Sequence, residues 1–203
     1  RILDENSPMD LAYNEKVHPF IESYIGRNKA LISRMQGLKN LYFPLFEQQL
    51  DKYNLPLELK YLAIVESAMN PKAKSHSGAT GLWQFMYLTG KQYGLNVTSY
   101  MDERQDPIKA TEAACFYFEK LYDTFGDWNL VLAAYNGGPG NLKKWKQETN
   151  YLDDPLFFME SIPLRETRWF IEKILTKYWI YQNKNQKEMT SLKMLANGKD
   201  PLY

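Results

Sequence analysis

Glu66 is the residue best suited to acid–base chemistry, because it falls on an otherwise apolar helical stripe. The run from Leu57 to Met69 has helical character, and its positions 59, 62, 63, 66 and 69 share one side. Apart from Glu66 these positions hold only apolar residues: Leu59, Leu62, Ala63 and Met69. Apolar surroundings disfavour a charged carboxylate, so one interpretation is a carboxyl with a raised pKa that acts as a general acid. The competing interpretation is that Glu66, near the helix end, reaches solvent or a lysine.

Three further segments carry polar groups that could contact a ligand. A predicted loop at residues 75–81 begins at Ser75 and is rich in Ser, Gly and Thr, although it lacks the lysine of a P-loop. Gln84 is an amide between large apolar rings, and Tyr135 and Asn136 end a helix before a glycine-rich turn. Each also has a structural explanation: a connector, a core stripe and a helix C-terminal cap.

Metal and thiol chemistry find no support in the sequence. There is no HExxH motif, no cysteine cluster and no Asp-rich calcium loop, so we expect no metal and no other cofactor. Cys115 is the single cysteine, which excludes an intrachain disulfide. Its neighbours Ala114 and Phe116 indicate a buried thiol rather than a nucleophile, and only His18 and His76 could serve as a histidine partner.

The elements that must position these residues are helices. Apolar residues recur at helical spacing, Gly37 punctuates the first run, and Asp106 and Asp127 precede later ones. No alternating strand pattern of convincing length and no internal repeat is present. We therefore predict an all-α protein with helices at 17–36, 38–53 (bent or restarted at Pro44), 57–69, 82–93, 107–125, 128–135 and about 164–182.

Composition narrows the function further. With 203 residues, 44% of them hydrophobic and 24% charged, the chain suits one compact domain and is neither disordered nor collagen-like. Aromatic residues make up 15%, enough for a large core or for a groove that binds sugar or nucleobase faces. A net charge of +1 argues against nucleic acid as a partner. No apolar run is long enough to span a membrane.

Taken together and in this order, the segments resemble the lytic transglycosylases of the soluble-transglycosylase (SLT) type. The resemblance runs from about Val17 to Lys177, and the helix pair before Glu66 looks like the membrane-bound lytic murein transglycosylase D subfamily. That subfamily often carries LysM modules, which this sequence does not contain. The motifs that carry the resemblance are Leu55–Leu59, Glu66-Ser67, Gly78–Met86, Asp102-Glu103-Arg104, Ala133–Gly138 and Ile162–Arg168.

The resemblance implies a lysozyme-like helical domain that cleaves the MurNAc-β-1,4-GlcNAc bond of peptidoglycan without water and leaves 1,6-anhydro-MurNAc ends. It assigns Glu66 as the acid and then the base. We expect an N-terminal helical extension at 1–45, the lysozyme-like domain at 46–182 and a polar tail at 183–203.

Further site residues are carried over from the resemblance one by one. Tyr135 would hydrogen-bond Glu66, and Gln84 and Asn136 would contact the sugars. Ser75 matches a serine near the N-acetyl pocket, and Glu160 matches an acidic residue that lines the cleft in some relatives. One departure concerns Phe170, where the family usually has a tyrosine, so any hydrogen bond from that hydroxyl must be replaced or absent.

Two alternatives stay open at this point. A goose-type-like muramidase would hydrolyse the same bond with an ordered water, and a non-catalytic glycan-binding module or envelope scaffold would keep the groove alone. The resemblance implies peptidoglycan glycan strands as the partner, a monomer, and a place in the bacterial cell envelope, periplasmic or associated with the outer membrane. Any signal or membrane anchor would lie outside this sequence.

Overall fold

The computed structural model describes residues 29–149, 158, 161–168, 170 and 173–174. Within these residues, β-type pairing is limited to three isolated bridges, so the all-α prediction is confirmed. The helices are α2 (Lys29–Lys52), the 3-10 helix η1 (Leu57–Tyr61), α3 (Leu62–Ser67), α4 (Tyr87–Gln92), the 3-10 helix η2 (Glu103–Gln105), α5 (Pro107–Phe125), α6 (Trp128–Gly137) and α7 (Pro139–Glu148).

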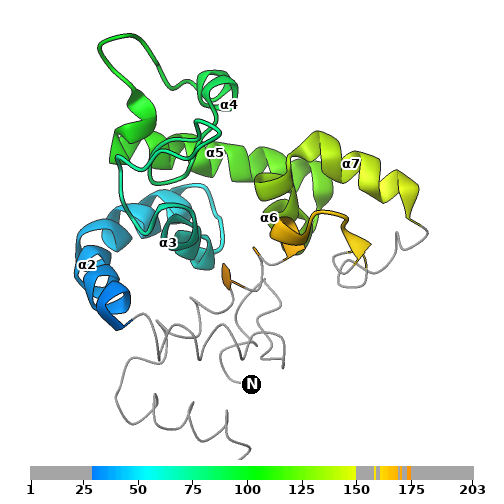
Figure 1. Cartoon of the computed structure of the whole chain (residues 1–203), viewed down its shortest axis with the longest axis horizontal. Coiled ribbons are helices and arrows are strands. Elements are labelled where there is room, and N and C mark those ends of the chain that lie inside the picture. Colours follow the sequence, from blue (N-terminus) through cyan, green and yellow to red (C-terminus); the bar gives the residue numbers. More distant parts are fainter. Residues whose placement is uncertain (1–28, 150–157, 159–160, 169, 171–172, 175–203) are drawn as a thin grey trace, which may run out of the picture.

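Helix α5 runs through the middle of this part of the molecule (Figure 1). It packs against both α2 and α6, and α7 packs on α6. Trp83 lies at the centre of the core with no exposed surface, in edge-to-face contact with Phe46 of α2 and Phe118 of α5. The loop that carries Trp83 is thereby fixed between two long helices.

The predicted starts of α5 and α6 are confirmed, because each has an aspartate cap. Asp106 accepts hydrogen bonds from two main-chain N–H groups of the first turn of α5, and Pro107 occupies its first position. Asp127 accepts one from Leu130 at the start of α6. Gly126, in the left-handed conformation, ends α5 and allows the sharp turn into α6.

The predicted break at Gly37 is wrong, since α2 continues through both Gly37 and Pro44. Proline removes one helical hydrogen bond, but burial of an apolar face compensates for that loss. Met35, Phe43, Phe46 and Leu50 of this helix are all buried in the core.

The predicted helix at 82–93 is wrong over its first five residues. Helix α4 begins at Tyr87, and Gln84 instead adopts a left-handed conformation with φ of 49° in a tight turn. Helix α7 was not predicted, because the glycine-rich run before it suggested only a turn. Pro139 at the first position of α7 supplies the helical φ that starts it.

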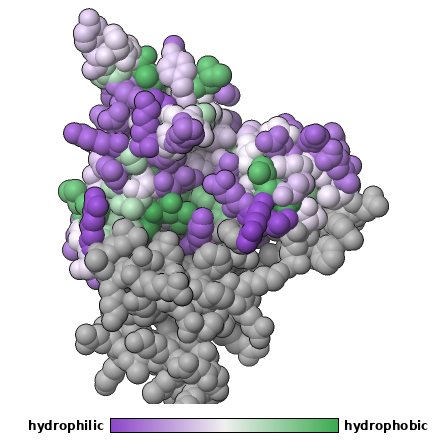
Figure 2. Space-filling model, in the orientation of Figure 1, coloured by the Kyte–Doolittle hydropathy of each residue, from purple (hydrophilic) through white to green (hydrophobic). Residues whose placement is uncertain are grey.

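On the face shown in Figure 2, hydrophilic side chains dominate the described surface and hydrophobic ones gather in small groups. No helix in the described ranges is both long enough and apolar enough to cross a membrane.

Candidate active site

Glu66 stands at an abrupt helix end, as the last residue but one of α3. Ala68 and Met69 both have left-handed backbones, with φ of 51° and 56°. Their N–H groups donate back to the carbonyls of Ile64 (3.0 Å) and Ala63 (3.1 Å). Two consecutive non-glycine residues in this conformation are costly, and such strain is common at functional sites.

The apolar stripe around Glu66 is confirmed, and Glu66 itself is partly buried. Its four companions Leu59, Leu62, Ala63 and Met69 have no exposed surface. Burial, helped by the negative charge of Glu166, raises the pKa of Glu66 to about 8, while the positive charge of Lys173 opposes the shift. The direction of this shift favours the general-acid interpretation over the solvent-facing one, because a carboxyl with such a pKa is mainly neutral at pH 7.

Two side chains near Glu66 hold the same piece of main chain. The Ser67 hydroxyl hydrogen-bonds the carbonyls of Ala63 (2.9 Å) and Leu82 (3.0 Å). The Tyr135 hydroxyl donates to the next carbonyl along, that of Trp83, at 2.5 Å. The ends of α3 and α6 are thus joined through residues 82–83.

The expected hydrogen bond between Tyr135 and Glu66 is not formed. The Tyr135 hydroxyl donates to the Trp83 carbonyl instead, and the described residues show no hydrogen bond between Tyr135 and Glu66. Burial first, and the charge of Glu66 second, raise the pKa of Tyr135. Tyr135 is connected to Glu66 through the main chain of residues 82–83 and the hydroxyl of Ser67.

Gln84 and Ser75 lie on one loop, and the polar groups of both side chains hydrogen-bond the main chain of that loop. The Gln84 amide nitrogen donates to the carbonyls of Gly81 (2.9 Å) and Ala73 (3.3 Å). The exposed Ser75 accepts a hydrogen bond from the N–H of Ala79 at 3.0 Å. Within the described residues, neither forms a hydrogen bond with Glu66.

Arg104 holds this loop in shape through hydrogen bonds to its main chain. Its guanidinium donates to the carbonyls of Gly78 (3.1 Å) and Phe85 (3.0 Å), and Asp102 binds its other nitrogens at 2.9 and 2.7 Å. The hydrogen bonds from Arg104 lower the pKa of the Asp102 carboxyl. Gly81 packs so closely that a Cβ there would lie 1.8 Å from the Arg104 carbonyl oxygen.

Asn136 is held by the helical segment at 165–168. Its side-chain oxygen accepts a hydrogen bond of 2.9 Å from the hydroxyl of the buried Thr167. Phe170, the position where the family usually has tyrosine, is buried in the core. The hydroxyl at Thr167 thus anchors α6 to this segment.

Four residues of the site were missed from the sequence: Ser67, Glu166, Thr167 and Lys173. Three of them follow residue 160, far from Glu66 in sequence, so only the fold brings them together. Glu166 and Thr167 lie in the matched stretch Ile162–Arg168 and Ser67 in the matched pair Glu66-Ser67, whereas Lys173 had no signal in the sequence. Glu160, predicted to line the cleft, lies outside the described residues. Cys115 is buried as predicted, and burial raises its pKa to about 12.

Sequence comparison finds one matching family and several named relatives. The transglycosylase SLT domain family matches residues 44–158. Membrane-bound lytic murein transglycosylase D of Escherichia coli K12 is 35% identical over 177 residues, 86% of this chain. The soluble lytic murein transglycosylase of the same strain is 35% identical over 119 residues, 56% of this chain and 18% of its own. The chain spans 39% of the length of the D enzyme.

Structure comparison finds the same kind of protein. The crystal structure of the 70-kDa soluble lytic transglycosylase of Escherichia coli superposes with a TM-score of 0.58 at 29% identity. It covers 79% of this chain and 25% of that one. The complex of the 70-kDa soluble lytic transglycosylase with bulgecin A gives a TM-score of 0.64 at 28% identity, covering 85% and 29%.

Proposed function

The chain belongs to the transglycosylase SLT domain family, and from this premise we propose that it is a peptidoglycan lytic transglycosylase. The substrate is the MurNAc-β-1,4-GlcNAc bond. The observation that carries the proposal is a carboxyl, Glu66, with a pKa of about 8 where the ends of α3 and α6 meet the loop at 82–85. A general acid has to be protonated at working pH, and Glu66 meets that requirement near neutrality.

The reaction needs one carboxyl in two protonation states. Neutral Glu66 gives its proton to the glycosidic oxygen, the C1–O bond breaks, and the N-acetyl oxygen of MurNAc stabilises C1. The resulting Glu66 carboxylate takes the proton of the C6 hydroxyl, and O6 bonds to C1 to close the 1,6-anhydro ring. No water enters the products, and the carboxyl ends as it began.

The other predicted residues orient this centre or the sugars. Tyr135 and Ser67 fix the carbonyls of residues 82–83 beside the acid. Asn136, held at its oxygen by Thr167, has its amide nitrogen for a sugar contact. Ser75 and Gln84 form the loop wall against which the sugars bind, and Glu160 remains a proposed cleft residue.

Hydrolysis of the same bond is the second candidate, and Glu166 is the observation that favours it. This exposed glutamate is near enough to Glu66 to raise its pKa. Two carboxyls, one acid and one base for water, are the usual equipment of glycoside hydrolases. In a transglycosylase, Glu166 serves instead to keep Glu66 protonated.

Product mass separates the two reactions. We expect digestion of purified peptidoglycan to release muropeptides one water lighter than those of a muramidase digest and resistant to borohydride. Heavy oxygen incorporated at C1 from labelled water would overturn the transglycosylase reading. Glu66→Gln should keep the fold and lower turnover by roughly 10²–10⁴-fold, whereas the exposed control Glu148→Gln should retain it.

The setting follows from the same premise. We propose that the protein acts as a monomer on glycan strands in the bacterial cell envelope, without a metal. We retain the division into an extension at 1–45, a catalytic domain at 46–182 and a tail at 183–203 as part of this proposal.

A further inference from the structure

Two neighbouring cavities lie along helix α5 and share Tyr53 in their walls. One has a volume of about 370 Å³ and extends to Glu103 and Lys109, and the other has about 450 Å³ and extends to Trp128. Their α5 residues run from Lys109 to Asp123 at helical spacing, so they follow one face of the helix over about 21 Å. We call this surface the α5 groove. Both volumes fall in the range of ligand sites.

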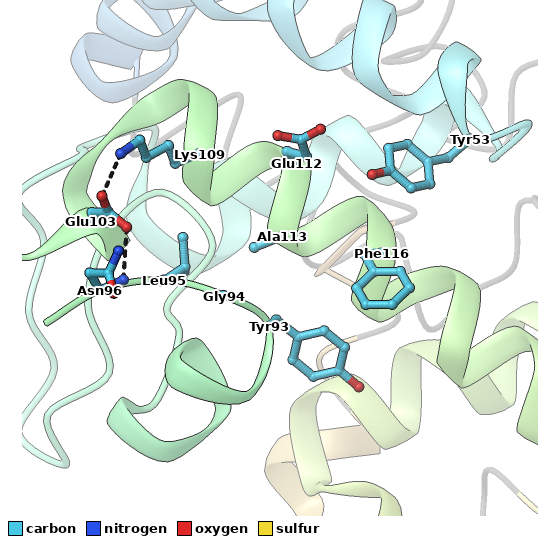
Figure 3. Close-up of a pocket in the computed structure, with 10 residues that line it drawn as sticks. All are labelled: Tyr53, Tyr93, Gly94, Leu95, Asn96, Glu103, Lys109, Glu112, Ala113 and Phe116. Atoms are coloured by element: carbon cyan, nitrogen blue, oxygen red, sulfur yellow. Dashed lines mark hydrogen bonds and ion pairs between the residues drawn. The ribbon is translucent and has the colours of Figure 1, made fainter.

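Aromatic rings line the α5 groove at intervals. Tyr93 and Phe116 meet edge to face at 5.7 Å, and Figure 3 shows Phe116 between Tyr93 and Tyr53. In the second cavity Tyr122 stacks on Trp128 at 4.4 Å, and 39% of Tyr122 stays exposed. Such rings offer flat apolar faces to a ligand.

Three of the four carboxylates between the rings have a lysine partner at close range, whereas Glu119 lies 3.9 Å from Lys120 and shares it with Asp123. Glu112 pairs with Lys52 at 2.9 Å, Asp123 with Lys120 at 3.0 Å, and Glu103 with Lys109. The pairs of Glu112 and Asp123 are exposed and therefore weak, so their carboxylates can exchange a lysine for a ligand hydroxyl. Four carboxylates of the groove face three lysines, so the groove disfavours a phosphate. Its rings and carboxylate oxygens suit an uncharged, hydroxyl-rich ligand with flat faces.

The α5 groove is separate from the active site. Trp128 begins α6, whereas Tyr135 and Asn136 lie near its end, about 10 Å further along the helix axis. None of the residues lining the two cavities belongs to the active site described above.

We propose that the α5 groove is a second saccharide-binding site, which holds a peptidoglycan glycan strand away from Glu66. The identity of the saccharide rests on the proposed function. Pyranose rings would stack on Tyr122 and Phe116, and the carboxylates of Glu112, Glu119 and Asp123 would accept hydrogen bonds from sugar hydroxyls.

The test measures binding of the full chain in the Glu66→Gln background, so that strands are not cut. The probe is peptide-free glycan strands, compared with intact sacculi. Tyr122→Ala should weaken strand binding about fivefold, the size expected for one lost aromatic contact. The control Tyr100→Ala removes the same ring from a loop position that is 98% exposed, and it should bind like the parent.

Because Tyr122→Ala also removes a packed ring, a second variant keeps the aromatic pair intact. Glu119→Gln with Asp123→Asn should also weaken strand binding. Strand affinity equal to the parent in either groove variant would overturn the proposal. Weaker binding to sacculi with unchanged binding to peptide-free strands would assign the groove to peptide stems and overturn it as well.

The proposed function fails on a different measurement, namely an absence of anhydro products from the wild-type chain. If the proposed function holds, Tyr122→Ala in the active chain should leave turnover of a short soluble glycan fragment unchanged and lower turnover of sacculi. Loss of turnover on both substrates would contradict a separate binding site.

Discussion

Glu66 can stay protonated near neutral pH because of its position at the end of α3. The helix ends one residue later, so the side chain leaves an apolar stripe at the point where the chain turns away. Burial favours the neutral form, and Glu166 adds to that preference, whereas Lys173 opposes it without prevailing. A protonated carboxyl is thereby available at a pH where most carboxyls are charged.

The raised pKa of Glu66 predicts a pH-dependent stability. The folded state keeps the proton up to about pH 8, whereas the unfolded chain loses it near 4.5, so this contribution to stability falls as pH rises between these values. The expected loss is about 1.4 kcal/mol for each pH unit in that window. Glu66→Gln removes the dependence, so thermal melts should show the variant gaining on the wild type from pH 5 to pH 8. A difference that does not change with pH would refute the assignment.

Tyr135→Phe should lower turnover about tenfold and leave glycan affinity nearly unchanged. The substitution removes the donor to the Trp83 carbonyl, a hydrogen bond worth about 0.5–1.5 kcal/mol, and loosens the main chain beside Glu66. Steady-state kinetics and strand binding measure the two effects separately. Tyr117→Phe is the control, because the Tyr117 ring packs beside Tyr135 and the substitution removes a hydroxyl that has no assigned role. Equal kinetics for both variants would count against a positioning role for Tyr135.

At the scale of elements, the loop that carries Gln84 depends on Arg104. One guanidinium bridges the carbonyls of Gly78 and Phe85, and Asp102 fixes its orientation. The loop has little apolar surface of its own apart from Leu82, Trp83 and Phe85. Its shape is therefore set by main-chain acceptors bound to a buried charge.

Gly81→Ala should destabilise the protein more than Gly78→Ala. Both glycines have a left-handed backbone, with φ of 90° and 85°, so both variants incur the strain of about 1–2 kcal/mol. Only at Gly81 would the new Cβ collide with the Arg104 carbonyl oxygen, whereas nothing lies within 4 Å at Gly78. Urea unfolding compares the two, and turnover should fall with the Gly81 variant. Similar unfolding midpoints for the Gly81→Ala and Gly78→Ala variants would mean that the loop can shift to accommodate the new Cβ at little cost in stability.

The local signals in the sequence were enough for α5 and α6 but not for this loop. Asp106, Pro107, Asp127 and Gly126 act on their own neighbours, so their effect is visible in sequence. Gln84 looked helical because its flanking rings are apolar. Its turn is instead set by Arg104, 20 positions away. The active site shows the same limit of local sequence signals. Glu66 could be predicted from the apolar stripe around it, whereas Glu166 has no local pattern that places it near Glu66.

At the scale of the whole molecule, the active site rests on a core built around Trp83. Phe46 and Phe118 pack on its indole ring from α2 and α5, and its carbonyl receives the Tyr135 hydroxyl from α6. Four segments that are distant in sequence therefore meet at one residue. Any shift of this indole moves the main chain beside Glu66.

Thr111 holds the indole in place, and Thr111→Val should reveal how much that matters. The Thr111 hydroxyl donates to the Pro107 carbonyl (2.6 Å) and accepts from the Trp83 ring nitrogen (3.0 Å). Valine has nearly the same shape, but it leaves the buried N–H unpaired, which should cost about 1–3 kcal/mol. Thr124→Val is the matched control on the same helix, because Thr124 makes the same bond to the carbonyl four residues back while exposed. That variant should stay within about 0.5 kcal/mol of the wild type. We expect chemical unfolding and turnover assays to show that Thr111→Val lowers both stability and activity, whereas Thr124→Val lowers neither. If both variants had equally small effects on stability and activity, the core would tolerate an unpaired indole N–H.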